Sequence, residues 1–168
     1  MGSRQQLSKV QLKSVTVGDS EIKPISSVHS LGAWSDKNLS MSIYVSKVYS
    51  KAFRGLYSIR QIRKYLSEDA TKVVVHAFVT SHLDYCNSLL YGIPKYDQLQ
   101  RIVNAAACIV CLVPKFNHIT PVLCNLHCLP VPYRIQFKIL LLVHQAVFIV
   151  APVYLKKLLS FKESSSYN

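Results

Sequence analysis

The chain has 168 residues, of which 50% are hydrophobic and 17% are charged. This length and apolar content suffice for one domain with a hydrophobic core and exclude a wholly disordered chain. Twenty Lys and Arg residues against eight Asp and Glu give a net charge of +12. This charge indicates a polyanionic partner, with nucleic acid ahead of an anionic membrane surface. High apolar content at low charge density also suggests that part of the surface packs against protein outside this chain.

The N-terminal segment has no apolar stretch of the kind found in a secretory signal. Residues 1–11 are polar, which predicts a frayed end. The five cysteines are most simply reduced thiols, so a nuclear or cytoplasmic location is expected rather than secretion. The apolar run Ile139–Ala151 has about 13 residues, whereas a bilayer span needs about 20. No membrane partner is therefore expected.

A small β element is predicted at the start of the chain. The segment Val10–Ile25 alternates loosely around Val17–Ser20, which contains turn-forming residues between two short extended segments. Residues 25–34 can add a third strand. The first 36 residues are therefore expected to form two to three short strands.

Helical periodicity begins at Asn38. Ser40 is the expected N-cap of a first helix, in which apolar residues recur at steps of three or four: Val45, Val48, Ala52, Leu56, Ile59 and Leu66. A second helix is expected to begin after Ser67, because two acidic residues follow it, and to end at Gly92.

Three further helices and one short helical turn complete the prediction. They cover residues 96–112, a short segment capped by Thr120, residues 132–150, and residues 152–159. The predicted fold class is mainly α, with the small N-terminal β element followed by a bundle of five to six helices. The predicted divisions are residues 1–36, 37–113, 114–161 and a disordered tail at 162–168.

The most specific pattern in the chain runs from Ala70 to Pro94. Shorter motifs between about Leu31 and Leu159 accompany it in a consistent order, among them Asn104–Ala107, His118–Leu123 and Tyr133–Ile135. Together they resemble the region that follows the catalytic palm in reverse transcriptases of non-LTR (LINE-type) retrotransposons, of the chicken-repeat and jockey-like lineages. In that family the region carries the thumb, which grips primer and template.

The resemblance implies the end of a palm, a helical thumb and the start of a C-terminal connector. The parent activity would be RNA-directed DNA synthesis, with the catalytic carboxylates and Mg²⁺ in a palm upstream of this chain. No cofactor is expected here, and the chain alone is expected to be non-catalytic. The implied partners are an RNA–DNA primer–template duplex and the missing palm and fingers.

The chain also departs from the family pattern. Cys108, Cys124 and Cys128 stand where the family usually has Arg, Tyr and Trp, and Phe148–Val150 replaces a segment that usually carries Gly. Such changes are typical of a decaying copy of a mobile element. The alternatives are a domesticated, non-catalytic helical module that binds nucleic acid or protein, and a membrane-associated basic helical protein.

Basic residues are the candidate nucleic-acid contacts. Lys47, Lys51 and Arg54 fall at i, i+4 and i+7 of the first helix, opposite its apolar face, and no Asp or Glu occurs from residue 37 to residue 67. A solvated face without a ligand is the alternative. Three more candidate contacts cluster at the end of this helix without an acidic residue between them: Arg60, Arg63 and Lys64. The resemblance implies three others: Arg101, Arg134 and Lys138.

The other candidate constellations have simpler explanations. Tyr49, Phe53 and Tyr57 could stack bases, but core packing is the favoured interpretation. The adjacent acids Glu68 and Asp69 suit a helix first turn rather than two-metal catalysis. The remaining candidate is a CxxC motif inside an apolar helix, for which buried thiols are favoured over zinc: Cys108 and Cys111.

Overall fold

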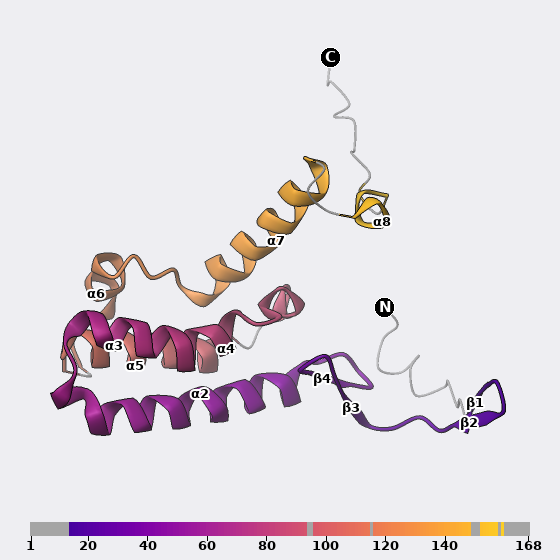
Figure 1. The fold of residues 1–168 in the computed structure, drawn as a ribbon, viewed down its shortest axis with the longest axis horizontal. Helices are drawn as coiled ribbons and strands as arrows, with labels where there is room; N and C mark the ends of the chain where they lie inside the picture. The colour runs from indigo at the N-terminus through magenta and orange to yellow at the C-terminus, as the bar shows by residue number, and fades with distance from the viewer. Residues whose placement is uncertain (1–13, 94–95, 115, 149–151, 158, 160–168) are drawn as a thin grey trace, which may run out of the picture.

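The structure of the chain is a computed structural model that describes residues 14–93, 96–114, 116–148, 152–157 and 159 (Figure 1). Two short antiparallel hairpins come first, and about six helices follow them. The predicted fold class, mainly α with a small N-terminal β element, is confirmed. The predicted frayed end and the predicted disordered tail lie outside the described residues.

The β element consists of two separate hairpins. The predicted turn around Gly18 is confirmed, and the strands on either side of it pair in register from Val15 with Ile22. The region expected to add a third strand forms a second hairpin of two strands. Leu31 (φ 47°) and Gly32 (φ 80°) both have positive φ, as the two-residue turn of such a hairpin requires. The strands are β1 (Val15–Val17) with β2 (Ser20–Ile22), and β3 (Ser27–Ser30) with β4 (Ala33–Asp36).

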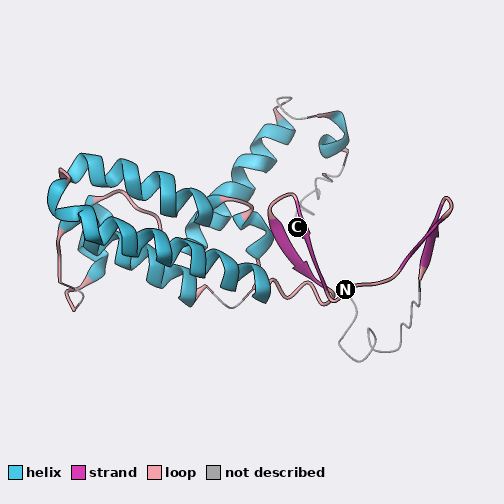
Figure 2. Cartoon of the chain, turned by 60° about the horizontal axis from the view of Figure 1, so that its bottom comes forward, coloured by secondary structure: helices cyan, strands magenta, loops and turns pink. Residues whose placement is uncertain are grey.

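The two hairpins differ in their environment. Every residue of β1 and β2 is exposed, and this hairpin stands apart from the helices (Figure 2). The second hairpin lies against the start of the first described helix, α2 (Ser42–Ile62). The Tyr85 ring lies 3.0 Å from where a Cβ on Gly32 would be, and its hydroxyl donates to the Leu31 carbonyl. The second hairpin is therefore anchored to the helices and the first is not.

Helix α2 begins two residues later than Ser40. Met41, in a left-handed conformation (φ 54°), occupies the N-cap position without a side-chain bond. Ser40 is held instead by the Asp36 carboxylate, which accepts from the Ser40 amide at 2.9 Å and from its hydroxyl. The expected Ser40 cap is therefore wrong, whereas the predicted apolar face is largely confirmed. Its buried residues are Tyr44, Val45, Ala52, Leu56 and Ile59.

The predicted second helix is divided in the structure. Ser67 is its N-cap as expected and accepts from the Ala70 amide at 3.2 Å. The regular helix stops at Asp84 rather than Gly92, because Tyr85 is extended and Cys86 is left-handed (φ 52°). Its segments are α3 (Glu68–Val75), the π-helical turn η2 (His76–Thr80), α4 (Ser81–Asp84) and the 3-10 turn η3 (Asn87–Leu90). Before Ser67, the 3-10 turn η1 (Arg63–Tyr65) directly follows α2.

Four helices follow, close to the predicted positions: α5 (Asp97–Cys111), α6 (Ile119–Asn125), α7 (Val131–Val147) and α8 (Val153–Lys156). The N-cap of α6 is His118 rather than the expected Thr120, whereas Pro132 lies in the first turn of α7 as predicted. Helices α2, α3 and α5 contact one another and enclose much of the core. Helix α7 projects away from them (Figures 1 and 2).

Candidate nucleic-acid interface

The outward side of α2 carries three of the predicted basic residues in one row. We call Lys47, Lys51 and Arg54 the basic stripe; all three are exposed. Helix α2 contains no acidic residue, and within the described part of the chain no carboxylate forms an ion pair with the stripe. The Lys47 ammonium lies 5.5 Å from the centroid of the Trp34 ring, and Arg54 Nε donates to the Ser50 carbonyl at 3.3 Å. These cations are therefore open to a phosphate.

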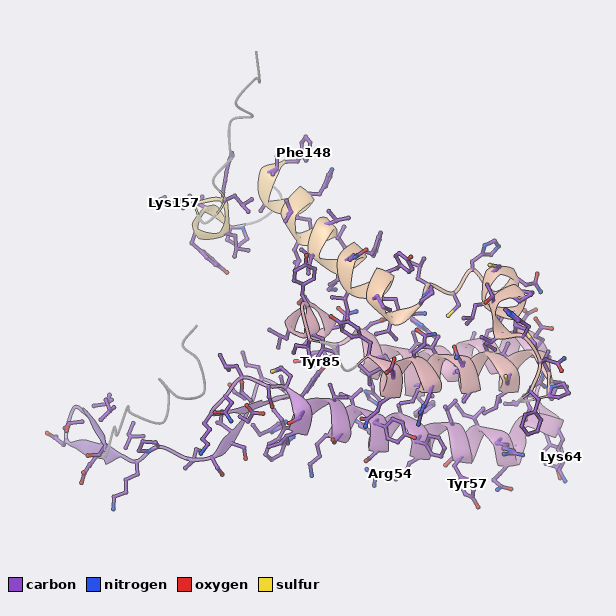
Figure 3. All side chains as sticks on the ribbon, turned by 180° about the vertical axis from the view of Figure 1, so that it is seen from behind. Arg54, Tyr57, Lys64, Tyr85, Phe148 and Lys157 are labelled. Atoms are coloured by element: carbon purple, nitrogen blue, oxygen red, sulfur yellow. The ribbon has the colours of Figure 1, made fainter. Side chains whose placement is uncertain are left out.

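A second row lies beside the first and continues from α2 into η1. It consists of Phe53, Tyr57, Arg60 and Lys64, again at i, i+4, i+7 and i+11, and we call it the aromatic–basic stripe. Phe53 is 49% exposed and Tyr57 is 64% exposed, so the core-packing interpretation is wrong for both. The buried side of α2 is already filled by other residues, and the helical phase turns these two rings outward. The figure labels three side chains that point away from the other helices: Arg54, Tyr57 and Lys64 (Figure 3).

Arg63 does not belong to either row, although the sequence placed it among the phosphate contacts. Its side chain is buried, and Nε and Nη2 donate to the carbonyls of Ile109 at 2.8 Å and Val110 at 2.7 Å. Nη1 donates to the Leu66 carbonyl at 2.7 Å. Two of these acceptors are at the C-terminus of α5, where a cation also interacts favourably with the helix dipole. Arg63 therefore holds η1 against α5 and is not available to a phosphate.

Arg134 is likewise engaged inside the protein. Its Nη1 contacts both carboxylate oxygens of Asp84, at 3.1 and 2.9 Å, and Nη2 lies 3.0 Å from Cys128 Sγ. Burial alone would lower the pKa of Arg134, but Asp84 and Cys128 outweigh it and raise the pKa above its usual value. Arg134 therefore joins α7 to α4. The two other residues added by the resemblance are Arg101, exposed on α5, and Lys138, half-buried on α7.

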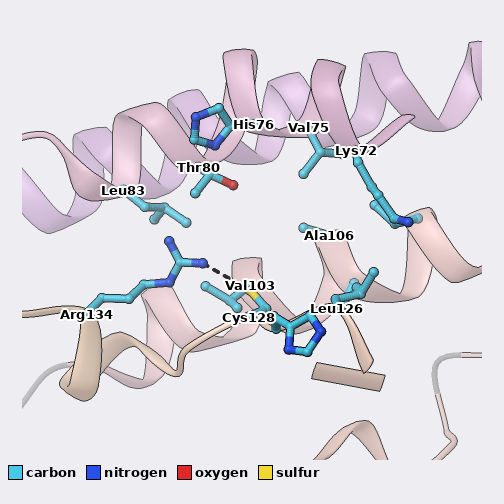
Figure 4. Close-up of a pocket in the computed structure, with 13 residues that line it drawn as sticks. Lys72, Val75, His76, Thr80, Leu83, Val103, Ala106, Leu126, Cys128 and Arg134 are labelled. Atoms are coloured by element: carbon cyan, nitrogen blue, oxygen red, sulfur yellow. Dashed lines mark hydrogen bonds between the residues drawn. The ribbon is translucent and has the colours of Figure 1, made fainter. Parts of the chain in front are cut away.

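A separate pocket of about 240 Å³ lies where α3, η2 and α4 face α5 (Figure 4). Its walls are mainly apolar, with Val75, Leu83 and Val103 among the lining residues, and Lys72 and Arg134 at its edge. Both cations are engaged, because the Lys72 ammonium pairs with Glu68 at 2.9 Å and with Asp69 at 3.3 Å, and Arg134 pairs with Asp84. The pocket therefore offers neither cation to an anionic ligand.

The cysteines of the CxxC motif are free thiols within α5. Cys108 and Cys111 are half-buried, and burial, with a further contribution from Glu68, raises the pKa of the Cys111 thiol. Among the residues that the structure describes, no three His, Cys, Asp or Glu side chains come close enough to hold a metal ion.

None of the described helices has both the length and the apolarity needed to cross a bilayer.

Comparisons with known proteins identify no relative: no protein-family model, no curated protein and no solved structure matches the chain. Of the nine predicted contacts, the structure places three in the basic stripe and two in the aromatic–basic stripe. For the two exposed aromatic rings, Phe53 and Tyr57, the sequence favours core packing over base stacking, and the structure differs. Phe53 and Tyr57 share one row of the helix with the charged Arg60, at i, i+4 and i+7, and this spacing indicates an outward position.

Proposed function

We propose that this chain is a thumb-like fragment of a non-LTR retrotransposon reverse transcriptase, and that it binds the backbone of an RNA–DNA primer–template duplex without catalysing synthesis. The observation that carries the binding proposal is the basic stripe. Lys47, Lys51 and Arg54 are exposed on one row of a helix without acidic residues, in a chain with a net charge of +12. The mainly helical fold after a small β element agrees with the architecture that the resemblance implies.

The length of the basic stripe suits a duplex backbone. From Lys47 to Arg54 the helix rises about 10 Å, which corresponds to about three nucleotides of one strand at the 3.4 Å spacing of B-DNA. Contacts of this kind read charge and position rather than base sequence. The binding should therefore be strongly dependent on salt and weakly dependent on sequence.

The test is the salt dependence of binding to a fluorescein-labelled RNA–DNA hybrid, followed by fluorescence anisotropy. Each phosphate neutralised by a cation contributes about −0.9 to the slope of log affinity against log salt for B-DNA. Replacing Lys47, Lys51 and Arg54 together by Gln should flatten the slope by about two to three units. Stability should change by only about 0.5 kcal/mol, because the positions are exposed.

A charge-matched control separates these contacts from the general effect of a positive protein. The triple variant Lys23→Gln, Lys156→Gln and Lys157→Gln removes the same charge from exposed positions outside α2. Its slope should stay within about one unit of the unmodified chain. Equal flattening in both triple variants would show that α2 has no special role and would contradict the proposal.

A protein-interaction role is the second candidate, and the outward side of α7 favours it. Four large apolar side chains on this side, three of α7 and one of its C-cap residue, are at least 59% exposed: Tyr133, Phe137, Leu140 and Phe148. Such a patch is typical of a surface that contacts another protein. In the proposed parent enzyme this patch would contact the palm or fingers. If the chain bound no hybrid at low salt, this side of α7 would become its principal candidate surface.

A further inference from the structure

The aromatic–basic stripe has a composition that a duplex backbone does not require. Phe53 and Tyr57 expose large aromatic surfaces to solvent, and Arg60 and Lys64 follow them on the same row. A duplex presents its phosphates outward and keeps its base faces stacked inside. The cations suit such a ligand, but the two rings would find no base to contact. The exposed rings therefore indicate a ligand whose bases are unpaired.

The rings are also held in position. Tyr49 is half-buried, and its ring lies 5.6 Å from the Phe53 ring, with 22° between the two planes. Phe53 is therefore supported from the protein side and presents its remaining surface to solvent. Beyond the stripe, Tyr65 is 77% exposed, and the Lys64 ammonium lies 4.8 Å from its ring centroid. Aromatic surface thus extends to the end of η1.

The spacing of the rings favours an extended strand. Phe53 and Tyr57 are one helical turn apart, about 6 Å along the axis, whereas neighbouring bases in a stacked strand are 3.4 Å apart. Successive bases of an extended single strand could each meet one ring. The charges agree with this ligand, because the positions of Arg60 and Lys64 suit phosphates and no acidic residue occurs from residue 37 to residue 67.

We propose that the aromatic–basic stripe of α2 and η1 binds single-stranded nucleic acid, with bases stacked on Phe53 and Tyr57 and phosphates on Arg60 and Lys64. The stripe is distinct from the basic stripe but adjacent to it. The inference rests on the proposed function, because it extends the nucleic-acid surface of α2 from a duplex to the unpaired strand beside it. The unpaired template strand that extends from a primer–template duplex has both the exposed bases and the phosphates that such a site would bind.

The test compares two probes on the full chain: a fluorescein-labelled oligouridine and a blunt RNA–DNA hybrid. The double variant Phe53→Leu and Tyr57→Leu keeps apolar side chains but removes both rings. Because the stacking of bases on aromatic rings contributes strongly to single-strand binding, oligouridine affinity should fall about 10-fold or more, while hybrid affinity should change less than about twofold. The matched control is Tyr133→Leu with Phe137→Leu, two rings of α7 that are each 59% exposed, and it should leave both affinities unchanged.

The outcomes separate this inference from the proposed function. If the unmodified chain binds hybrid but not oligouridine, the single-strand site is overturned and the duplex proposal stands. An unchanged oligouridine affinity in the folded Phe53 and Tyr57 variant would also overturn it, and so would an equal loss for both probes. If that variant instead turned a dimer into a monomer in sedimentation, with oligouridine binding intact, the stripe would be a protein contact and the inference would be wrong.

Discussion

At the scale of single residues, Arg63 shows how one side chain can have a structural role in a run of exposed cations. It lies between Ile62 and Lys64, both exposed, yet its guanidinium donates to three backbone carbonyls. The carbonyls at the end of a helix have no partner within the helix, and hydrogen bonds from a charged donor satisfy them well. Arg63 is therefore expected to contribute to stability rather than to binding.

We predict that Arg63→Met lowers the free energy of unfolding by about 2–4 kcal/mol, because it leaves three carbonyls without this donor and two of them are at the end of α5. Urea denaturation followed by circular dichroism measures the change. The control Arg60→Met, at an exposed position one turn earlier, should change stability by only about 0.5 kcal/mol. Similar effects in the two variants would contradict the structural role of Arg63.

His82 is expected to make the stability depend on pH. Its burial, with a further contribution from the nearby Lys51 cation, lowers the pKa of His82 below the usual 6.5. The unfolded chain then binds this proton more tightly than the folded chain, so the stabilisation is present above the unfolded pKa and is lost as the pH falls towards the folded pKa.

We therefore predict that the unfolding midpoint in urea decreases from pH 7 to pH 5, and that His82→Gln removes part of this decrease. His118→Gln, at an exposed histidine, is the control and should keep the decrease. A bound phosphate would offset the charge of Lys51, so adding the RNA–DNA hybrid should raise the pKa of His82 in an NMR titration. An identical pH dependence with and without His82 would refute this prediction.

At the scale of the elements, Gly55 sets the distance between α2 and η2. Glycine inside a helix costs about 1 kcal/mol relative to alanine, so its presence needs a packing reason. A Cβ at Gly55 would lie 3.1 Å from the Phe78 carbonyl oxygen and 3.6 Å from Val79 Cγ2. Helix α2 and the π-helical turn therefore approach backbone to backbone at this position.

We predict that Gly55→Val lowers the free energy of unfolding by about 2 kcal/mol, because the added methyl groups would collide with the backbone of η2. Thermal and urea unfolding measure this change. Gly55→Ala should cost less, since the better helix propensity of alanine offsets part of the contact. Ser58→Val, on the exposed side of the same helix, controls for the β-branched side chain. An equal loss of unfolding free energy in Ser58→Val would mean that the close approach of α2 and η2 does not contribute to the effect of Gly55→Val.

At the scale of the whole molecule, the acidic residues are few, and several are already engaged. Glu68 and Asp69 share Lys72, and Asp84 pairs with Arg134. Two-metal nucleotidyl transfer needs at least two carboxylates that converge on the ions. We therefore predict that the purified chain, with Mg²⁺, a primed template and deoxynucleotides, extends no primer. Template-dependent incorporation that survives stringent purification and is lost on acid-to-amide substitution within this chain would contradict the prediction.

The sequence by itself determined the helical class of the protein and the limits of several elements. Ser67 begins its helix, Pro132 lies in the first turn of α7, and α5 ends before Pro114, all as predicted. These features depend on interactions within one turn, such as a capping hydroxyl or a missing amide hydrogen. The buried row of α2 was also predictable, because apolar periodicity identifies the side of a helix that faces the core.

Only the tertiary structure decided where the second predicted helix stops and which outward residues remain exposed. The chain leaves the helix after Asp84, where the Tyr44 hydroxyl donates to the Tyr85 carbonyl and the Tyr85 hydroxyl donates to Leu31. Arg63 is buried because the end of α5 lies beside it, and Phe53 and Tyr57 stay exposed because no described element covers that side of α2. Contacts between residues more than forty positions apart leave no local pattern, so periodicity and capping rules could not reveal them.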